Sequence, residues 1–130
     1  MAEPVIIWHI ADIHIERKRH KAIYYAFDQL VQKIEQQQVS KKHYLVIAGD
    51  VFEYKTKYSQ TDLACFHYLL NKTQQIPNLK VVIIPGNHDY SEAHELDLIS
   101  AALINTKYDN VYHFPKSGKY IFDDVEFYVH

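Results

Sequence analysis

Three short, almost uninterrupted apolar runs constrain the fold of this chain more than any other feature. They are "PVIIWHIA" (4–11), "HYLVIAGD" (43–50) and "LKVVIIPG" (79–86). Continuous apolar runs of this length are typical of strands that are buried on both faces of a parallel sheet. Parallel neighbours need a long crossover connection, usually a helix. The sequence therefore predicts an α/β fold.

Amphipathic segments lie between and after these runs, where the crossovers are expected. The segment 20–38 places five apolar side chains on one helical face: Ile23, Phe27, Leu30, Val31 and Ile34. A second helix is predicted over 61–75, with Ser59 or Thr61 as its N-cap. A third is predicted over 92–106, capped by Ser91.

The remaining chain changes pattern. "NVYHF" (110–114) and "KYIFDDVEFYV" (119–129) are typical of short strands, the latter forming a hairpin that turns at Asp123 and Asp124. The expected order is βαβαβα followed by a β-rich tail.

Composition adds a few limits. The chain has 130 residues, 48% of them hydrophobic and 23% charged, which suits one core-forming domain or part of one. Cys65 is the single cysteine, so no disulfide within the chain is expected, and we expect it to be a small buried apolar residue. The sequence contains neither an apolar run of about 20 residues nor a signal-peptide pattern. We therefore expect no membrane association and an intracellular location, in the cytoplasm or nucleus.

Polar residues suited to metal binding follow each apolar run. Asp12 and His14 follow the first, Asp50 ends the second, and Asn87, His88 and Asp89 follow the third. Ligands of open parallel sheets bind outside the carboxyl ends of the strands, so these side chains are expected to converge. Carboxylates beside a dry strand are costly unless a positive charge compensates them, as a metal ion does.

These motifs carry a family resemblance. "DIH", "GD" and "GNHD" resemble the first three motifs of the calcineurin-like metallophosphoesterase superfamily. Within it, "HIADIHIE", "YLVIAGDVFEYK" and "VVIIPGNHDY" are similar to SbcD-type nucleases of DNA double-strand-break repair, and Phe52 after "GDV" favours that branch. The resemblance implies a metallophosphoesterase-type layered sheet with flanking helices, an incomplete αββα sandwich. Residues 1–130 would be the N-terminal part of a single nuclease domain of this kind.

The resemblance also implies roles for individual residues. Asp12 and His14 would bind one divalent ion, Asp50 would bridge two, and Asn87 would bind the second. The ions would most commonly be Mn²⁺, although ligands of this kind also suit Fe and Zn. His88 would face the phosphate and stabilise its charge or protonate the leaving oxygen. Asp89 would orient His88 or bind nearby backbone.

The later motifs of the family are absent. The sequence contains no Gly-His dipeptide, so the second metal would lack ligands unless His130 supplies one. The chain is then either a piece of a longer nuclease, which is our preferred interpretation, or a short form that has lost full catalysis. In either case the 130 residues alone are not necessarily active.

The function predicted on this basis is metal-dependent hydrolysis of DNA phosphodiester bonds, as an exonuclease or endonuclease in repair or recombination. The resemblance implies an SbcC-like coiled-coil ATPase as a partner, and a homodimer. Two alternatives stay open: a phosphoesterase for a small phosphorylated substrate or phosphoprotein, and a non-catalytic module that retains the fold. The basic stretch "ERKRHK" (16–21) either contacts a polyanion or is a solvated helix face.

The other histidines receive simpler interpretations. His9 is expected to be a packed core residue of the first strand. His20, His43, His67 and His94 are expected on the surface, or in the core with their hydrogen bonds satisfied.

Overall fold

A computed structural model describes residues 5–37, 42–52, 59–84, 90–91, 96–97, 102–103, 106–114, 118–122 and 125–129. Its elements in chain order are β1 (Ile6–Ala11), the 3₁₀ helix η1 (Arg17–Arg19), α1 (His20–Gln36), β2 (His43–Ala48), α2 (Gln60–Thr73), β3 (Leu79–Ile84), β4 (Tyr90–Ser91), β5 (Leu96–Asp97), β6 (Val111–His113), β7 (Gly118–Phe122) and β8 (Val125–Val129).

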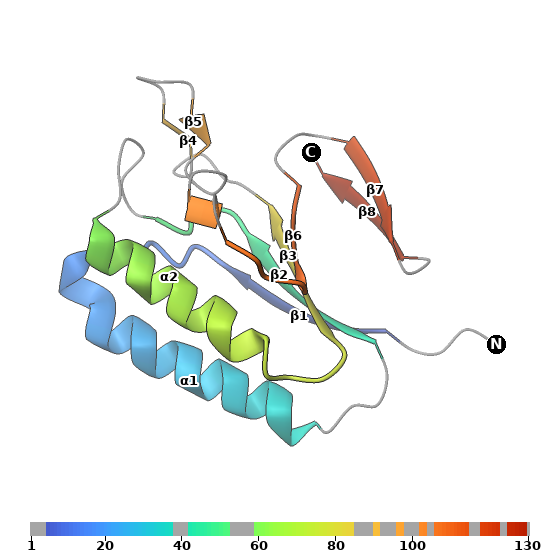
Figure 1. The fold of residues 1–130 in the computed structure, drawn as a ribbon, viewed down its shortest axis with the longest axis horizontal. Coiled ribbons are helices and arrows are strands. Elements are labelled where there is room, and N and C mark those ends of the chain that lie inside the picture. The colour runs from blue at the N-terminus through green and yellow to red at the C-terminus, as the bar shows by residue number, and fades with distance from the viewer. Residues whose placement is uncertain are drawn as a thin grey trace.

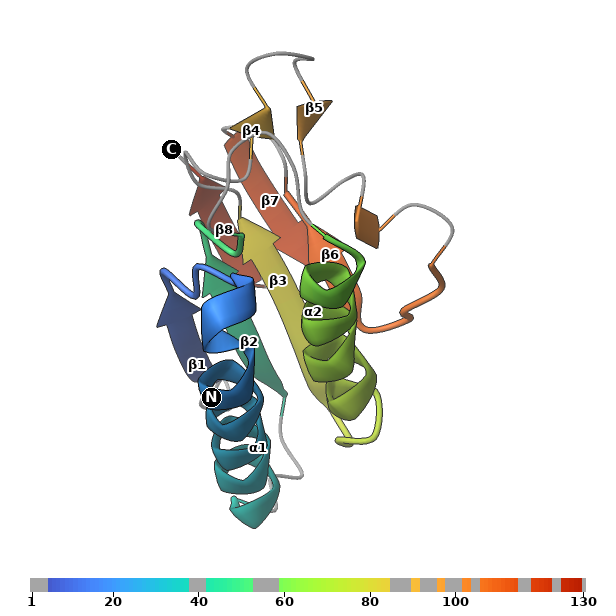
Figure 2. The same cartoon turned by 90° about the vertical axis from the view of Figure 1, so that its left-hand side faces the viewer.

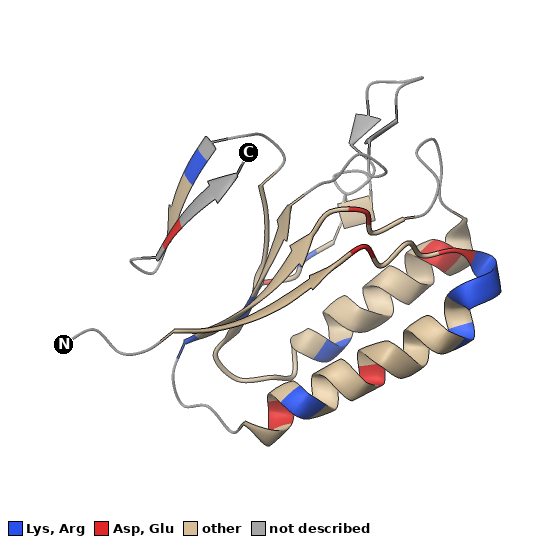
Figure 3. Cartoon of the chain, turned by 180° about the vertical axis from the view of Figure 1, so that it is seen from behind, with Lys and Arg blue, Asp and Glu red and all other residues tan. Residues whose placement is uncertain are grey.

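A four-stranded parallel sheet in the order β1-β2-β3-β6 forms the centre of the fold. Both long helices, α1 and α2, cover one face of this sheet (Figure 1; Figure 2). The antiparallel hairpin β7–β8 lies on the other side, as Figure 3 shows from behind. The predicted α/β fold class, with helices flanking a parallel sheet, is confirmed.

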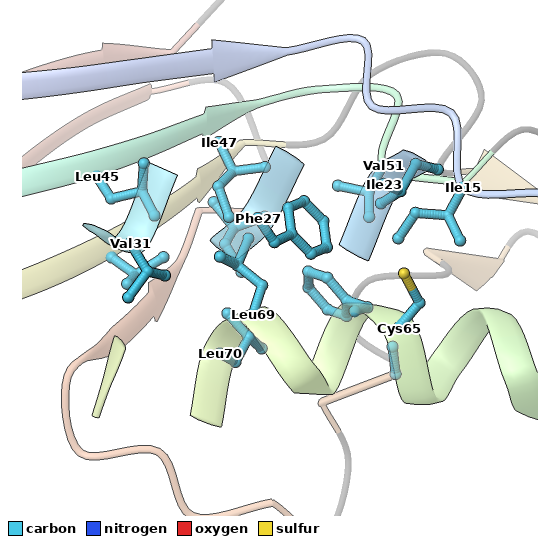
Figure 4. Close-up of a cluster of buried hydrophobic side chains, with 14 of the residues drawn as sticks. Ile15, Ile23, Phe27, Val31, Leu45, Ile47, Val51, Cys65, Leu69 and Leu70 are labelled. Atoms are coloured by element: carbon cyan, nitrogen blue, oxygen red, sulfur yellow. The ribbon is translucent and has the colours of Figure 1, made fainter. Parts of the chain in front are cut away.

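The main core lies between the sheet and the two helices (Figure 4). Leu45 and Ile47 of β2 meet Phe27 of α1 and Leu69 of α2, all of them buried. The apolar face predicted for the first helix is confirmed, because Ile23, Phe27, Val31 and Ile34 are its buried residues. Cys65 is also fully buried in this cluster, as its sequence neighbours indicated.

A smaller core lies on the opposite face of the sheet. Tyr44, Val46 and Val82 are buried there beside Phe114, whose ring stacks on Tyr120 of β7 with centroids 4.0 Å apart. The hairpin predicted from "KYIFDDVEFYV" therefore forms, and Phe114 and Tyr120 connect it to the sheet. The turn residues Asp123 and Asp124 lie outside the described residues.

The prediction that the first strand is buried on both faces is wrong. β1 is at the edge of the four-stranded sheet, and its residues alternate between partly buried and exposed. Ile7 is 54% exposed, and His9, expected in the core, is exposed as well. An apolar run shows that a strand has apolar residues on both faces, but it does not show whether both faces are covered.

The start of the third predicted helix is also wrong, although two of its later residues are helical. Leu96–Asp97 pairs with Tyr90–Ser91 as a short antiparallel ladder, so Ser91 belongs to a strand and is not an N-cap. Ala102 and Leu103 are helical. Backbone pairing overrides the helical pattern of this segment.

The second helix begins as predicted. Ser59 is the N-cap of α2 and accepts a hydrogen bond from the amide of Asp62, whose carboxylate accepts from the amide of Ser59. No helix in the described part of the chain is long and apolar enough to cross a membrane.

Candidate metal centre

The loops after β1 and β2 run side by side past the ends of their strands. The amide of Asp12 donates to the carbonyl oxygen of Gly49 at 3.3 Å, and the amide of His14 donates to that of Asp50 at 2.9 Å. The amide of Ile15 then donates to the carbonyl of Val51 at 2.7 Å. The two loops therefore hold Asp12, His14 and Asp50 in register by backbone hydrogen bonds.

Potential ligand atoms of these three side chains gather in one place. One atom each from Asp12, His14 and Asp50 lies within 4.8 Å of the other two. The Nε2 of His14 is 3.8 Å from Oδ1 of Asp12. Two atoms that each bind one ion at about 2.1 Å are at most about 4.2 Å apart, so this pair fits a single ion.

The backbone at the cluster is conformationally costly. Asp12, His14 and Asp50 have φ angles of 55°, 51° and 54°, in the left-handed region that side chains other than glycine rarely occupy. In the described part of the chain, Asn78 is the one further non-glycine residue with positive φ. Such residues gather where function requires a fixed geometry, which supports a functional role for this cluster.

Gly49 completes the connection to the third strand. Its φ of 76° suits glycine, and its amide donates to the carbonyl oxygen of Ile84 at 2.6 Å. Ile84 is the last residue of β3. The carboxyl ends of β1, β2 and β3 therefore meet at one edge of the sheet, as the sequence predicts.

The three side chains of the cluster differ in their exposure to solvent. The Asp12 side chain is 71% exposed, whereas that of His14 is 23% exposed and Asp50 is intermediate. The Asp12 carboxylate is open to solvent, so an ion or an anionic substrate can reach the cluster from that side. Two carboxylates and an imidazole form a mixed oxygen and nitrogen set that suits Mn²⁺, Fe²⁺ or Zn²⁺. The donor chemistry therefore fits a divalent cation.

The remaining predicted site residues cannot be compared. Asn87, His88, Asp89 and His130 lie outside the described residues. The roles of Asn87 as a ligand and of His88 toward the phosphate therefore stay predictions.

Two features beside the cluster were not predicted as parts of a site. Nη1 of Arg19, in η1, donates to the carbonyl oxygen of His14 at 3.4 Å. His20, the first residue of α1, pairs through Nε2 with Oδ1 of Asp62 at 2.5 Å, and Asp62 is only 4% exposed. The dense positive charge of residues 16–21 was the sequence feature that could have indicated a role for Arg19. Nothing in the sequence signals the pair of His20 with Asp62, because the two residues are far apart along the chain.

His67 has satisfied hydrogen bonds, as expected, whereas the buried His43 has a partner at only one ring nitrogen. Nε2 of His43 is 3.0 Å from the carbonyl oxygen of Pro77, but its buried Nδ1 has no hydrogen-bond partner among the described residues. His67 contacts the hydroxyl of Tyr108 at 2.6 Å and the carbonyl of Ala102 at 3.1 Å. These two histidines join elements of the core and are separate from the cluster.

Comparison with known proteins agrees with the site. The chain is 31% identical over 125 residues to R555, an uncharacterised protein of Acanthamoeba polyphaga mimivirus. The match covers 93% of this chain but only 9% of that protein, so the chain spans a small part of this relative. The family model for calcineurin-like phosphoesterases matches residues 5–129. The chain belongs to the calcineurin-like phosphoesterase family.

Proposed function

We propose that this chain is part of a metal-dependent phosphodiesterase that hydrolyses DNA. Membership of the family indicates metal-dependent phosphoester hydrolysis. The observation that carries the proposal is the gathering of Asp12, His14 and Asp50 at the carboxyl ends of two parallel strands. That edge is where open α/β sheets bind their ligands.

Asp12, His14 and Asp50 are the residues that would hold the metal, with Asn87 as a further ligand. Mn²⁺ is the cation we propose for this mixed donor set. Bound divalent cations supply Lewis-acid stabilisation of the phosphoryl oxygens. The chain itself contributes ligand geometry, fixed by the backbone bonds between the two loops. His88 would stabilise charge on the phosphate or protonate the leaving oxygen.

DNA is proposed as the substrate on two grounds. The motifs around Asp12, Asp50 and His88 resemble those of SbcD-type nucleases. In addition, a strongly cationic segment begins three residues after His14, where a polyanion bound at the cluster would meet it. An SbcC-like coiled-coil ATPase and a second copy of the chain are the partners that this resemblance suggests.

Hydrolysis of model esters in the presence of Mn²⁺ tests the proposal. A DNA phosphodiesterase is expected to cleave bis-p-nitrophenyl phosphate and an end-labelled oligonucleotide in preference to p-nitrophenyl phosphate or a phosphopeptide. Asp50→Asn is expected to abolish this activity, while Asp109→Asn, at an exposed position outside the cluster, retains it. Preference for the monoester or the phosphopeptide would instead support the small-substrate alternative.

A further inference from the structure

A cluster of exposed cations lies next to the candidate metal centre. Arg17, Lys18 and Arg19 form η1, and Lys21 follows in the first turn of α1. All four residues are exposed, and none forms an ion pair with a carboxylate in the part of the chain that the structure describes. We call Arg17–Lys21 the cationic segment.

The placement of these charges does not stabilise the fold. Cations near the N-terminus of a helix interact unfavourably with the helix dipole, and α1 has no acidic residue in its first turn to offset them. The neighbouring helix α2 has the favourable arrangement, with Asp62 in its first turn. Four like charges within five residues also repel one another. The cationic segment is therefore better explained by an anionic ligand than by stability.

The cationic segment is held against the cluster. The bond from Arg19 to the carbonyl of His14 connects η1 to the loop that carries two of the candidate ligands. His20, the residue that follows Arg19, is fixed by its pairing with the buried Asp62. In Figure 3 the blue band of η1 and the start of α1 lies at the same end of the molecule as the loops that follow β1 and β2.

An apolar hollow lies beside the same segment. It has a volume of about 210 Å³ and lies between β1 and α1, with Ile10, Ile13, Phe27 and Leu30 among its lining residues. Its two charged residues are Asp12 and Arg19. Pockets for drug-sized molecules are usually about 300–1,000 Å³, so this hollow suits a smaller group such as a single planar ring system.

We propose that the hollow and the cationic segment together bind one nucleotide unit of a nucleic-acid strand, beside the phosphate held at the metal centre. The base lies in the hollow, Arg19 lies between base and phosphate, and Arg17, Lys18 and Lys21 contact the strand's flanking phosphates. A nucleic-acid strand joins planar, largely apolar rings to a phosphate at every unit, which matches one hollow beside several cations. A phosphopeptide offers a single phosphate, which leaves most of these cations without a partner. The inference rests on the proposed function and specifies its substrate contacts.

Binding without divalent metal separates this inference from catalysis. The probes are fluorescent oligothymidylate and an abasic oligonucleotide of the same length, followed by anisotropy in EDTA. The triple variant Arg17→Gln, Lys18→Gln, Lys21→Gln is expected to weaken binding of both probes at least tenfold. It should also reduce the salt slope of the binding constant by about 2. The matched control removes three cations elsewhere: Lys33→Gln, Lys72→Gln and Lys107→Gln. It is expected to change neither the affinity for the probes nor the salt slope.

Filling the hollow tests the contact with the base. Ala26 also lines the hollow and is exposed on α1, so Ala26→Phe occupies the space without disturbing the core. We expect this variant to bind oligothymidylate about tenfold more weakly, the scale of one stacked base, and to bind the abasic probe normally. Gln32→Phe, at an exposed position of α1 away from the hollow, is the control for an added aromatic ring.

Three results would overturn the inference: equal losses in the two triple variants, equal weakening of both probes by Ala26→Phe, or efficient displacement of oligothymidylate by a phosphotyrosyl peptide. Each is independent of hydrolysis. A chain that cleaves diesters with Mn²⁺ but shows any of these results keeps the proposed function and loses this inference. A chain that binds as expected but cleaves no diester loses the proposed function.

Discussion

The amide of His14 donates a hydrogen bond to the carbonyl oxygen of Asp50 over 2.9 Å, and both residues have left-handed backbone angles. The bond joins two loops that are separated by a whole helix in the sequence. It fixes the spacing of an imidazole and a carboxylate through the backbone, so their spacing does not depend on side-chain contacts alone. The relative position of these two side chains is therefore preorganised for a ligand.

The left-handed angle at Asp12 leads to a test of stability. Its side chain is largely exposed, so replacing it removes little packing. In metal-free buffer we expect Asp12→Gly to be more stable than Asp12→Ala by about 1 kcal/mol, because only glycine adopts this angle without steric cost. Urea unfolding measures the difference.

A helical position provides the control for that test. Ala26→Gly in α1 is expected to lower the free energy of unfolding by about 1 kcal/mol, because a helix interior favours alanine over glycine. If alanine were as stable as glycine at position 12, the strained geometry of the loop would be refuted.

The sequence predicted which strand ends converge, but not which strand lies at the edge of the sheet. Residue types at the ends of the strands were sufficient to group Asp12, His14 and Asp50, because parallel strands with helical crossovers bring their carboxyl ends together. Exposure of Ile7 was not predictable in this way, since it depends on which strand is at the edge. The left-handed angle of His14 was also beyond prediction, because histidine has no strong preference for it and the neighbouring loop imposes it.

Phe52 is expected to support the metal site from the core. It is buried, bridges to Ile15, and meets the ring of Phe66 edge to face with centroids 5.6 Å apart. Phe52→Leu should loosen the loop that carries Asp50 and weaken Mn²⁺ binding about tenfold, the scale seen for residues that support metal ligands.

The partner ring is the matched control. Phe66→Leu removes the same ring contact from the side of α2 and should cost similar stability, while leaving Mn²⁺ affinity unchanged. Equal effects of the two variants on affinity, measured by titration at a temperature where both are folded, would show that Phe52 has no special connection to the site.

The buried Asp62 joins the starts of the two helices, and its removal should be costly. Its carboxylate accepts from the amide of Ser59 at 3.1 Å and pairs with His20. We expect Asp62→Ala to lower the free energy of unfolding by about 3 kcal/mol, since it breaks a buried pair as well as a helix cap. Ser59→Ala removes only part of the cap and should cost about 1 kcal/mol.

Denaturant titration of these variants, with Asp109→Ala as an exposed carboxylate control, measures the order of the losses. A cost for Asp62→Ala no larger than that for Ser59→Ala would mean that the pair with His20 adds nothing to stability.

The buried thiol of Cys65 should make the free energy of unfolding fall at alkaline pH. Burial, and then the nearby Asp62 charge, raise the pKa of its thiol from 9.0 to about 11. Between these two values the unfolded chain loses the proton while the folded chain keeps it, so stability falls as pH rises from 9 to 11. The shift corresponds to roughly 2–3 kcal/mol of stability lost across that window.

Cys65→Ala isolates this effect from the titration of tyrosines and lysines. Its stability should fall less steeply over the same pH range when both proteins are unfolded with urea. Parallel curves for the two proteins would show that the thiol has the same pKa in the folded and unfolded chains.

Calorimetric titration of the metal-free chain with Mn²⁺ is the direct test of whether Asp12, His14 and Asp50 bind a metal ion. We expect saturable binding that Asp50→Asn and His14→Ala each weaken at least tenfold and that Asp109→Asn leaves unchanged. Two sites per chain would indicate that the second ion also finds its ligands within these residues, and one site that it does not. Mn²⁺ binding that is absent from the wild-type chain, or unaffected by Asp50→Asn and His14→Ala, would contradict the assignment of Asp12, His14 and Asp50 as the metal centre.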